Sequence, residues 1–214
     1  MNCYLVREAD GFTLVDCSVR GKAGAVIAAA EARGARIRRL VVTHAHWDHV
    51  GSLDDLSAAL PEARLLVGSR EAPILAGDLT IRPDEPVGRL RRLVYRKAAR
   101  RPDRLLEPGD RVESLEVLSA PGHTPGQIAL LDTRDRTLVC ADAYLNVGRP
   151  FVCSEVVLRF PFPALLGTWH APTAVQTARA LLELEPSRLA SGHGRVVEDP
   201  VARMEDAISR VSSS

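Results

Sequence analysis

The sequence lacks the features that would place it in a membrane or in an oxidising compartment. It has no run of 18 apolar residues and no apolar stretch behind a basic N-terminus, so we expect neither a transmembrane helix nor a signal peptide. Its four cysteines contain no CxxC pair and, in a chain of this length, are typical of buried thiols in a reducing cytosol. The sequence therefore predicts a cytoplasmic protein without a disulfide framework.

The chain as a whole also lacks an excess of charge of one sign. Its formal net charge is +1 at pH 7, so no global field marks it as a binder of nucleic acid or membrane. Hydrophobic residues make up 46% of the 214 positions, which is enough for one substantial core. Because the sequence contains neither a low-complexity linker nor a repeat of fixed period, we expect a single domain over residues 1–214.

One segment departs from this balance of charge. Residues 82–104 contain nine Arg or Lys and three Asp or Glu, a net charge of +6. Three interpretations are open: a solvated helical insertion, a lid that attracts an anionic substrate, and a nucleic-acid patch. The last is the weakest, because Tyr95 alone in this segment could stack on a base.

Short apolar runs alternate with helical patterns along the chain. Residues 38–43 and 137–142 are typical of buried strands, whereas residues 21–34 and 169–186 have helical spacing. Polar residues stand at the ends of the predicted strands. This order favours an α/β chain with two sheets packed face to face and helices outside, an αβ/βα four-layer sandwich.

Three of the six histidines lie within six consecutive positions of the motif THAHWDHVG, residues 43–51. His44, His46, Asp48 and His49 follow a predicted strand and precede a predicted helix. Imidazole nitrogen and carboxylate oxygen together suit zinc or a similar cation. Four donors so close in sequence do not fit comfortably around one tetrahedral ion. In an extended loop His44 and His46 would share one side, and Asp48 and His49 could turn toward a second ion.

Further donors stand at other junctions between a strand and a loop. His123 lies in PGHTPG, Asp142 ends the run TLVCAD, and His193 lies in SGHG. Each is weak evidence alone and gains weight from the local cluster. The remaining histidine, His170, lies at a predicted helix start, where a capping or surface role is favoured over ligation.

The motifs THAHWDHVG, PGHTPG, CAD and SGHG, in this order, resemble those of the metallo-β-lactamase superfamily over nearly the full chain. The resemblance implies an αβ/βα sandwich with a two-metal site in the cleft between the sheets. It also implies an assignment of the ligands: His44, His46 and His123 to the first metal, Asp48, His49 and His193 to the second, and Asp142 to both.

The donor set favours zinc, with iron or manganese as alternatives. The site resembles those of glyoxalase II and lactonase members more than those of penicillin-degrading members. The latter often carry a cysteine at the second metal, where this strand ends in Asp142, and we expect Cys140 to point into the core. The lactonases place a tyrosine shortly after the bridging aspartate. Tyr144 is therefore a candidate to polarise a carbonyl, and a packed strand-end tyrosine is the alternative.

These features predict a metal-dependent hydrolase, in which a hydroxide activated by two metals attacks a small thioester, ester or lactone. Bound metal lowers the pKa of water toward roughly 7, so a nucleophile exists at neutral pH. Asp48 would pass a proton to the leaving group, and Asp142 would hold both ions. Asp16 would either orient a ligand histidine or cap a turn. The alternatives are a phosphodiesterase or ribonuclease, and a mononuclear iron dioxygenase acting on glutathione persulfide.

The region between two of the ligand strands is expected to line the mouth of the cleft. An apolar pocket with a basic rim would suit an acyl chain with an anionic head, and ordinary loop packing is the alternative. The sequence names neither the substrate nor the oligomeric state. The candidate lining residues are Tyr144, Arg149, Phe160, Phe162 and Trp169.

Overall fold

The structure is a computed structural model that describes residues 1–157 and 167–212. Every helix in these ranges is too short or too polar to cross a membrane. The described chain divides into two compact units. The first unit contains residues 1–79 and 92–107, and the second contains residues 80–91 and the chain from residue 108 onward.

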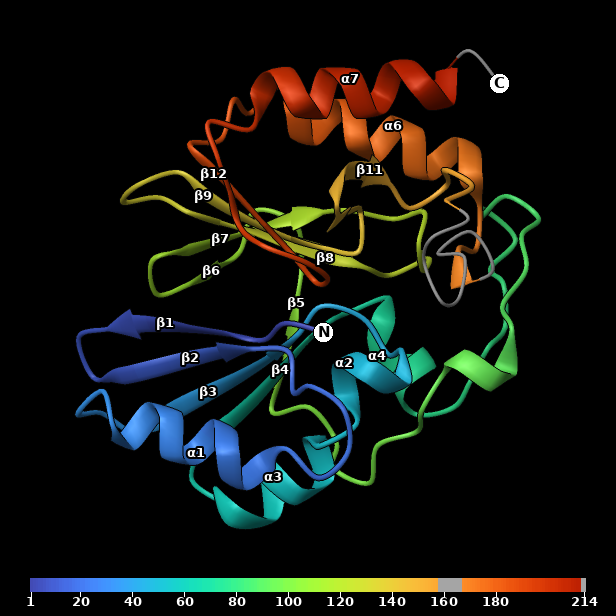
Figure 1. Ribbon diagram of the computed structural model, residues 1–214. Helices are drawn as coiled ribbons and strands as arrows, with labels where there is room; N and C mark the ends of the chain where they lie inside the picture. The colour runs from blue at the N-terminus through green and yellow to red at the C-terminus, as the bar shows by residue number, and fades with distance from the viewer. Residues whose placement is uncertain (158–166, 213–214) are drawn as a thin grey trace. The chain divides into compact units, whose positions relative to one another are not determined.

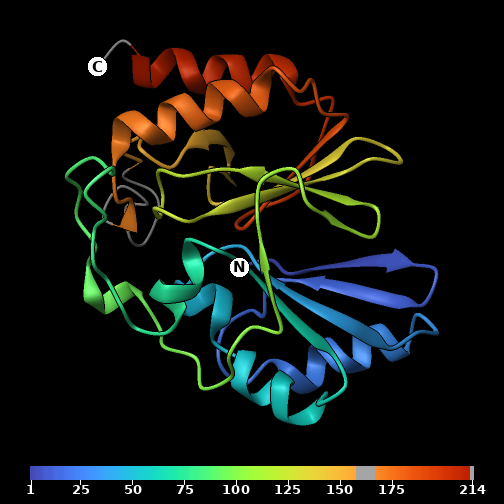
Figure 2. The ribbon, with the colours of Figure 1, turned by 180° about the vertical axis from the view of Figure 1, so that it is seen from behind.

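The first unit is built on one sheet with short helices. Its elements are β1 (Tyr4–Glu8), β2 (Gly11–Val15), α1 (Ala23–Glu31), β3 (Ile37–Val42), α2 (Trp47–Val50), α3 (Leu53–Ala59), β4 (Arg64–Gly68), α4 (Glu71–Leu75), the 3-10 turn η1 (Arg92–Val94) and β5 (Arg104–Leu106). The five strands lie in the order β1-β2-β3-β4-β5. β1 and β2 form an antiparallel hairpin, and β2 to β5 run parallel. Helices α1 and α3 lie on one face of this sheet (Figures 1 and 2).

Alternating apolar residues of the parallel strands attach these helices. Leu14, Leu40 and Leu65, from three neighbouring strands, belong to one buried cluster with Val26 of α1 and Leu56 of α3. Alternate residues of a strand point to the same face, so each strand presents such a row to the helices. Burial of each of these side chains contributes about 1.5–3 kcal/mol. The apolar rows thus fix the helices on one face and leave the strand ends to carry polar side chains.

The carboxyl ends of β2, β3 and β4 lie at one edge of the first sheet because these strands are parallel. Val15 pairs with Val41, which places Asp16 beside the end of β3. The motif that begins at Thr43 follows β3 directly, and Glu71 opens the short helix that follows β4. One edge of the first unit therefore holds every residue of the histidine-rich loop together with two carboxylates.

The second unit is built on a larger sheet and a separate hairpin. Its elements are β6 (Arg111–Val112), β7 (Leu115–Ser119), β8 (Ile128–Asp132), β9 (Thr137–Ala141), β10 (Tyr144–Val147), β11 (Arg149–Val152), α6 (Ala171–Leu182), β12 (Arg188–Ser191), β13 (Val197–Glu198) and α7 (Val201–Ser212). The sheet has the order β13-β12-β9-β8-β7-β6, and β10 pairs with β11. Helices α6 and α7 lie side by side over one face (Figures 1 and 2).

Three strands of the second sheet also end at a common edge. β7 and β9 are both antiparallel to β8, and β12 is parallel to β9, so β7, β9 and β12 run in the same direction. Ser191 pairs with Ala141 at that edge. The residues that follow these strands include His123, Asp142 and His193. The sheet order therefore gathers three predicted ligands that are far apart in sequence.

The helical interpretation of the basic segment, residues 82–104, is wrong. The segment contains one 3-10 turn, η1, and is otherwise irregular until β5 begins. Proline at three positions of the segment removes backbone donors and disfavours helix in the residue before it. The prolines are Pro83, Pro86 and Pro102.

Candidate metal centre

The histidine-rich loop of the first unit bends tightly between β3 and α2. His46 is the N-cap of α2, with extended backbone, and the helix begins at Trp47. The imidazole centroids of His44 and His46 lie 4.7 Å apart, and those of His44 and His49 lie 3.9 Å apart. Asp48 is less buried than these three histidines. The loop therefore concentrates three imidazoles and one carboxylate in a small volume.

Asp16 is a buried carboxylate that fixes the orientation of His49. Its Oδ2 lies 2.8 Å from Nδ1 of His49, and its Oδ1 accepts a hydrogen bond of 2.9 Å from the backbone N–H of Thr43. When a carboxylate accepts from Nδ1–H, Nε2 is the imidazole nitrogen whose lone pair could bind a metal. Of the two roles that the sequence left open for Asp16, the geometry supports orientation of a histidine, His49, which is a predicted ligand.

Thr43 fixes the tautomer of His44 in a similar way. Its Oγ1 donates to the carboxylate of Asp16 at 2.8 Å, so the hydroxyl proton is already used. The same Oγ1 lies 3.1 Å from Nδ1 of His44 and therefore accepts from that nitrogen. His44, like His49, is thus held so that Nε2 is the nitrogen that could bind a metal. Thr43 is the first residue of the motif, and its position directly before His44 was a usable signal of this role.

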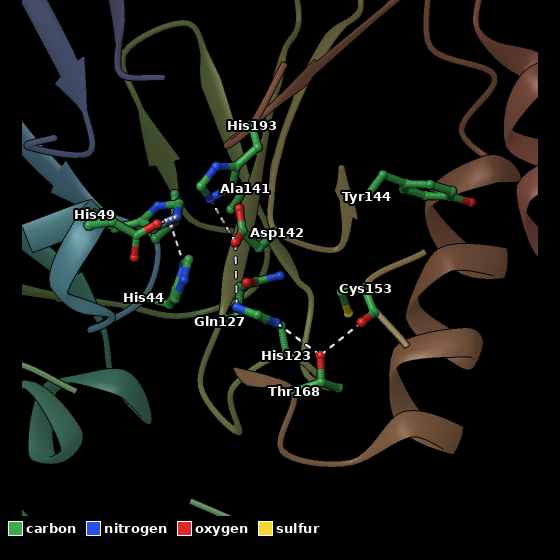
Figure 3. Close-up of polar contacts among 12 residues, drawn as sticks. His44, His49, His123, Gln127, Ala141, Asp142, Tyr144, Cys153, Thr168 and His193 are labelled. Atoms are coloured by element: carbon green, nitrogen blue, oxygen red, sulfur yellow. Dashed lines mark hydrogen bonds and ion pairs between the residues drawn. The ribbon is translucent and has the colours of Figure 1, made fainter. Parts of the chain in front are cut away.

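In the second unit, Asp142 stands between two predicted ligands. Its Oδ2 lies 3.5 Å from Nε2 of His123 and 3.4 Å from Nε2 of His193 (Figure 3). Two donors bound at about 2.0–2.1 Å to one tetrahedral ion are themselves about 3.3 Å apart. Each of these two carboxylate–imidazole distances therefore fits a pair of donors to one metal ion.

His123 is oriented from behind by Thr168. Oγ1 of Thr168 donates to the backbone carbonyl of Cys153 at 3.0 Å and lies 3.2 Å from Nδ1 of His123 (Figure 3). Because its proton goes to the carbonyl, the hydroxyl accepts from Nδ1–H. Three predicted ligands, His44, His49 and His123, therefore present Nε2 as the donor atom. Nothing in the local sequence pointed to Thr168, which is 45 residues from His123.

Two glycines permit the close packing of the ligand loops of the second unit. Gly122 has φ +131°, and a Cβ there would lie 2.4 Å from the backbone of Ala174 in α6. Gly194 has φ +91°, and a Cβ there would lie 1.5 Å from the carbonyl oxygen of Asn146. Side chains at these positions would displace His123 and His193, which explains the glycine next to each predicted ligand.

The structure places two further residues as the sequence predicted. His170 is the N-cap of α6 and accepts from the backbone N–H of Thr173, which confirms the capping role. Cys140 is buried in the core, as expected, and burial raises the pKa of its thiol to about 12. Its Sγ lies 3.5 Å from Oγ of the buried Ser191, inside the core.

The residues that the sequence suggested as lining of a substrate pocket lie in different environments. Tyr144 is fully buried, and its hydroxyl donates to the carbonyl of Ala178 in α6 at 2.8 Å, turned away from the ligands in Figure 3. The structure therefore supports the alternative of a packed tyrosine. The suggested contact of Tyr144 with a substrate carbonyl is wrong. Arg149 forms an ion pair with Glu155.

Trp169 is buried directly behind a predicted ligand. Its backbone N–H donates to the carbonyl of His123 at 2.9 Å, and its own carbonyl accepts from Arg89 at 3.0 Å. Trp169 therefore connects the start of the basic segment to the ligand loop of the second unit. The last two candidates, Phe160 and Phe162, lie outside the described residues.

Comparison with known proteins identifies the class of the chain. Residues 2–193 match the family model of the metallo-beta-lactamase superfamily, and the chain belongs to this superfamily. It is 38% identical over 210 residues to the uncharacterized protein YobT of Bacillus subtilis, covering 98% of this chain and 90% of YobT. Members of the superfamily bind divalent metals, and groups of the histidines and aspartates described above could hold a metal ion.

Other relatives have named activities at lower identity. The probable metallo-hydrolase YflN of B. subtilis is 26% identical, covering 90% of this chain and 80% of YflN. A hydroxyacylglutathione hydrolase of Vibrio cholerae serotype O1 is 27% identical, covering 88% of this chain and 69% of that enzyme. These matches confirm the predicted family and show that the chain is a metallo-hydrolase.

Solved structures confirm the predicted fold. TTHA1623, solved in a di-iron-bound form, is 26% identical with a TM-score of 0.66, covering 95% of this chain and 92% of that one. The B3 metallo-beta-lactamase BLEG-1 is 21% identical with a TM-score of 0.68, covering 94% and 90% of the two chains. The chain therefore has the metallo-β-lactamase fold.

Proposed function

We propose that the protein is a hydrolase with a binuclear metal centre that cleaves a small thioester, ester or lactone. The observation that carries the proposal is the shared orientation of His44, His49 and His123, each with Nδ1 bonded to a protein oxygen and Nε2 left as donor. Such partners are typical of metal-binding histidines, and a solvated histidine does not need them.

The proposed ligand set follows the family pattern, residue by residue. The proposed ligands are His44, His46 and His123 for one ion, Asp48, His49 and His193 for the other, and Asp142 for both. Zinc is the metal we favour, and iron is the alternative that the di-iron-bound form of TTHA1623 suggests.

The chain's own residues would divide the chemistry among them. When bound, two divalent ions supply a water of pKa near 7 and an electrophile for a carbonyl oxygen. Asp142 would fix the separation of the ions, and Asp48, the least buried carboxylate of the set, would carry a proton to the leaving group. Asp16, Thr43 and Thr168 would hold the imidazoles in their productive tautomers.

The thioester is favoured within this substrate class by the hydroxyacylglutathione hydrolase among the relatives. The basic segment, residues 82–104, adds a preference for an anionic substrate. The side chains of Arg89, Arg91 and Arg92 are exposed, and no ion pair is found for them among the described residues. Arg89 is attached to Trp169 beside His123, and Tyr95 lies against His46, so the basic segment reaches a ligand loop in each unit.

Metal analysis and a substrate panel test the proposal together. Protein purified without added metal should contain about two metal ions per chain. It should hydrolyse thioesters, esters or lactones faster than phosphodiesters. One iron per chain with oxygen uptake would indicate the dioxygenase instead, and cleavage of RNA with a steep salt dependence would indicate the nuclease.

His46→Ala should lower both metal content and turnover, because it removes a ligand outright. His170→Ala is the matched control, since His170 caps α6 and should affect stability by about 1 kcal/mol without loss of metal. Unchanged metal content in His46→Ala would refute the ligand assignment.

A further inference from the structure

Glu71 is a buried carboxylate in contact with the peptide that joins two of the proposed ligands. It is the first residue of α4 and has 0% exposure. Its Oε1 accepts a hydrogen bond of 2.8 Å from the backbone N–H of Ala45. Ala45 separates His44 from His46, so this bond fixes the backbone from which both imidazoles project.

The carbonyl of Ala45 is held as well. It accepts a hydrogen bond of 3.0 Å from the backbone N–H of Arg96, in the basic segment. The neighbouring Tyr95 pairs with His46 in an antiparallel bridge, and the two ring centroids lie 4.7 Å apart at 64°. The backbone between the two histidines is therefore clamped by two stretches of chain that are remote from it in sequence.

A buried carboxylate at this position lowers the stability of the fold unless its charge takes part in a favourable interaction. Burial of a charge is unfavourable, and a neutral oxygen would satisfy one backbone N–H. An ionised acceptor, however, forms a hydrogen bond about twice as strong as a neutral one. A negative charge in a medium of low dielectric also attracts a nearby cation strongly. Both effects would act on a metal held by His44 and His46.

We propose that Glu71 is a positioning residue for the metal centre. Its carboxylate holds the Ala45 amide, which sets the direction of His44 and His46, and its charge raises the affinity for the metal that these residues bind. This inference rests on the proposed function, because it takes His44 and His46 as ligands. We do not count Glu71 itself as a ligand, since it belongs to none of the groups of described side chains that could hold a metal ion.

Two substitutions separate the hydrogen bond from the charge. Glu71→Gln keeps an acceptor oxygen and removes the charge, whereas Glu71→Ala removes both. Zinc affinity of the metal-free protein, measured by competition with a chelator, should fall about tenfold in Glu71→Gln and up to about 100-fold in Glu71→Ala. Exchange of the Ala45 amide hydrogen in the metal-free protein should become faster in Glu71→Ala.

Ile74→Val is the matched control, because Ile74 is buried in the same helix and has no hydrogen bond to the loop. It should lower the Tm of the metal-free protein and leave zinc affinity and Ala45 exchange unchanged. If the Glu71 variants behave like this control, Glu71 has only a structural role and the proposal is overturned. If the wild type binds neither zinc nor iron, the proposed function fails, and Ala45 exchange in the same protein still decides whether Glu71 holds the loop.

Discussion

Nδ1 of His49 lies 2.8 Å from Oδ2 of Asp16, and both side chains are buried. Asp16 directly follows β2, whereas His49 lies 33 positions later in α2, the short helix after the neighbouring parallel strand β3. The contact fixes which imidazole nitrogen of His49 is protonated, and with it the atom that can bind a metal. The same principle applies to the pairs Thr43–His44 and Thr168–His123.

Asp16→Asn should weaken metal binding by about 10-fold to 100-fold, because the amide no longer stabilises the N–H of His49 as a carboxylate does. Titration of the metal-free protein with zinc measures the change. Asp10→Asn is a suitable control, since Asp10 forms a salt bridge with Arg39 at the surface of the same unit. Equal affinities in the two variants would exclude an orienting role for Asp16.

Thr168→Val should reduce metal affinity about tenfold, because it replaces the hydroxyl behind His123 by a methyl group of similar size. Loss of the bond to the Cys153 carbonyl should also lower the free energy of unfolding by roughly 1 kcal/mol. Thr168→Ser keeps the hydroxyl and should retain wild-type affinity. A serine variant as weak as the valine variant would show that the hydroxyl alone does not account for the metal affinity.

Replacement of Arg89, Arg91 and Arg92 together by Gln should raise KM for an anionic thioester about threefold to tenfold. The removed attractions at the surface amount to roughly 1 kcal/mol in total. The effect should shrink at high salt, and KM for a neutral ester should change little. Arg36→Gln, an exposed change elsewhere in the first unit, serves as the control. Equal changes for charged and neutral substrates would argue against recognition of an anion by the basic segment.

Tyr144→Phe should leave kcat and KM close to wild type, because the hydroxyl is bonded to Ala178 inside the core. It should lower the free energy of unfolding by about 1–2 kcal/mol, since the buried carbonyl loses its donor. Urea denaturation and steady-state kinetics check the two parts. A large loss of kcat in a stable Tyr144→Phe protein would restore Tyr144 as a residue that contacts substrate.

Much of the architecture was predictable because it depends on local patterns. The helical spacing of residues 21–34 and 169–186 predicted α1 and α6, and the apolar run 137–142 predicted β9. Those patterns record which face of each element is buried, and a short window of sequence contains that information. The helix that was one interpretation of residues 82–104 is wrong. That interpretation rested on the charge of the segment, whereas the prolines in the segment disfavour helical backbone.

The sequence by itself determined the donors and their places: histidines and aspartates directly after apolar strands, in an order that matches a metal-binding family. Only the tertiary structure decided which oxygen orients each imidazole, that the hydroxyl of Tyr144 turns into the core, and that the carboxylate of Glu71 is buried against Ala45. The physical reason is that strand periodicity is set by neighbours along the chain. A hydrogen-bond partner tens of residues away is set by strand order and packing, which no short stretch of sequence specifies.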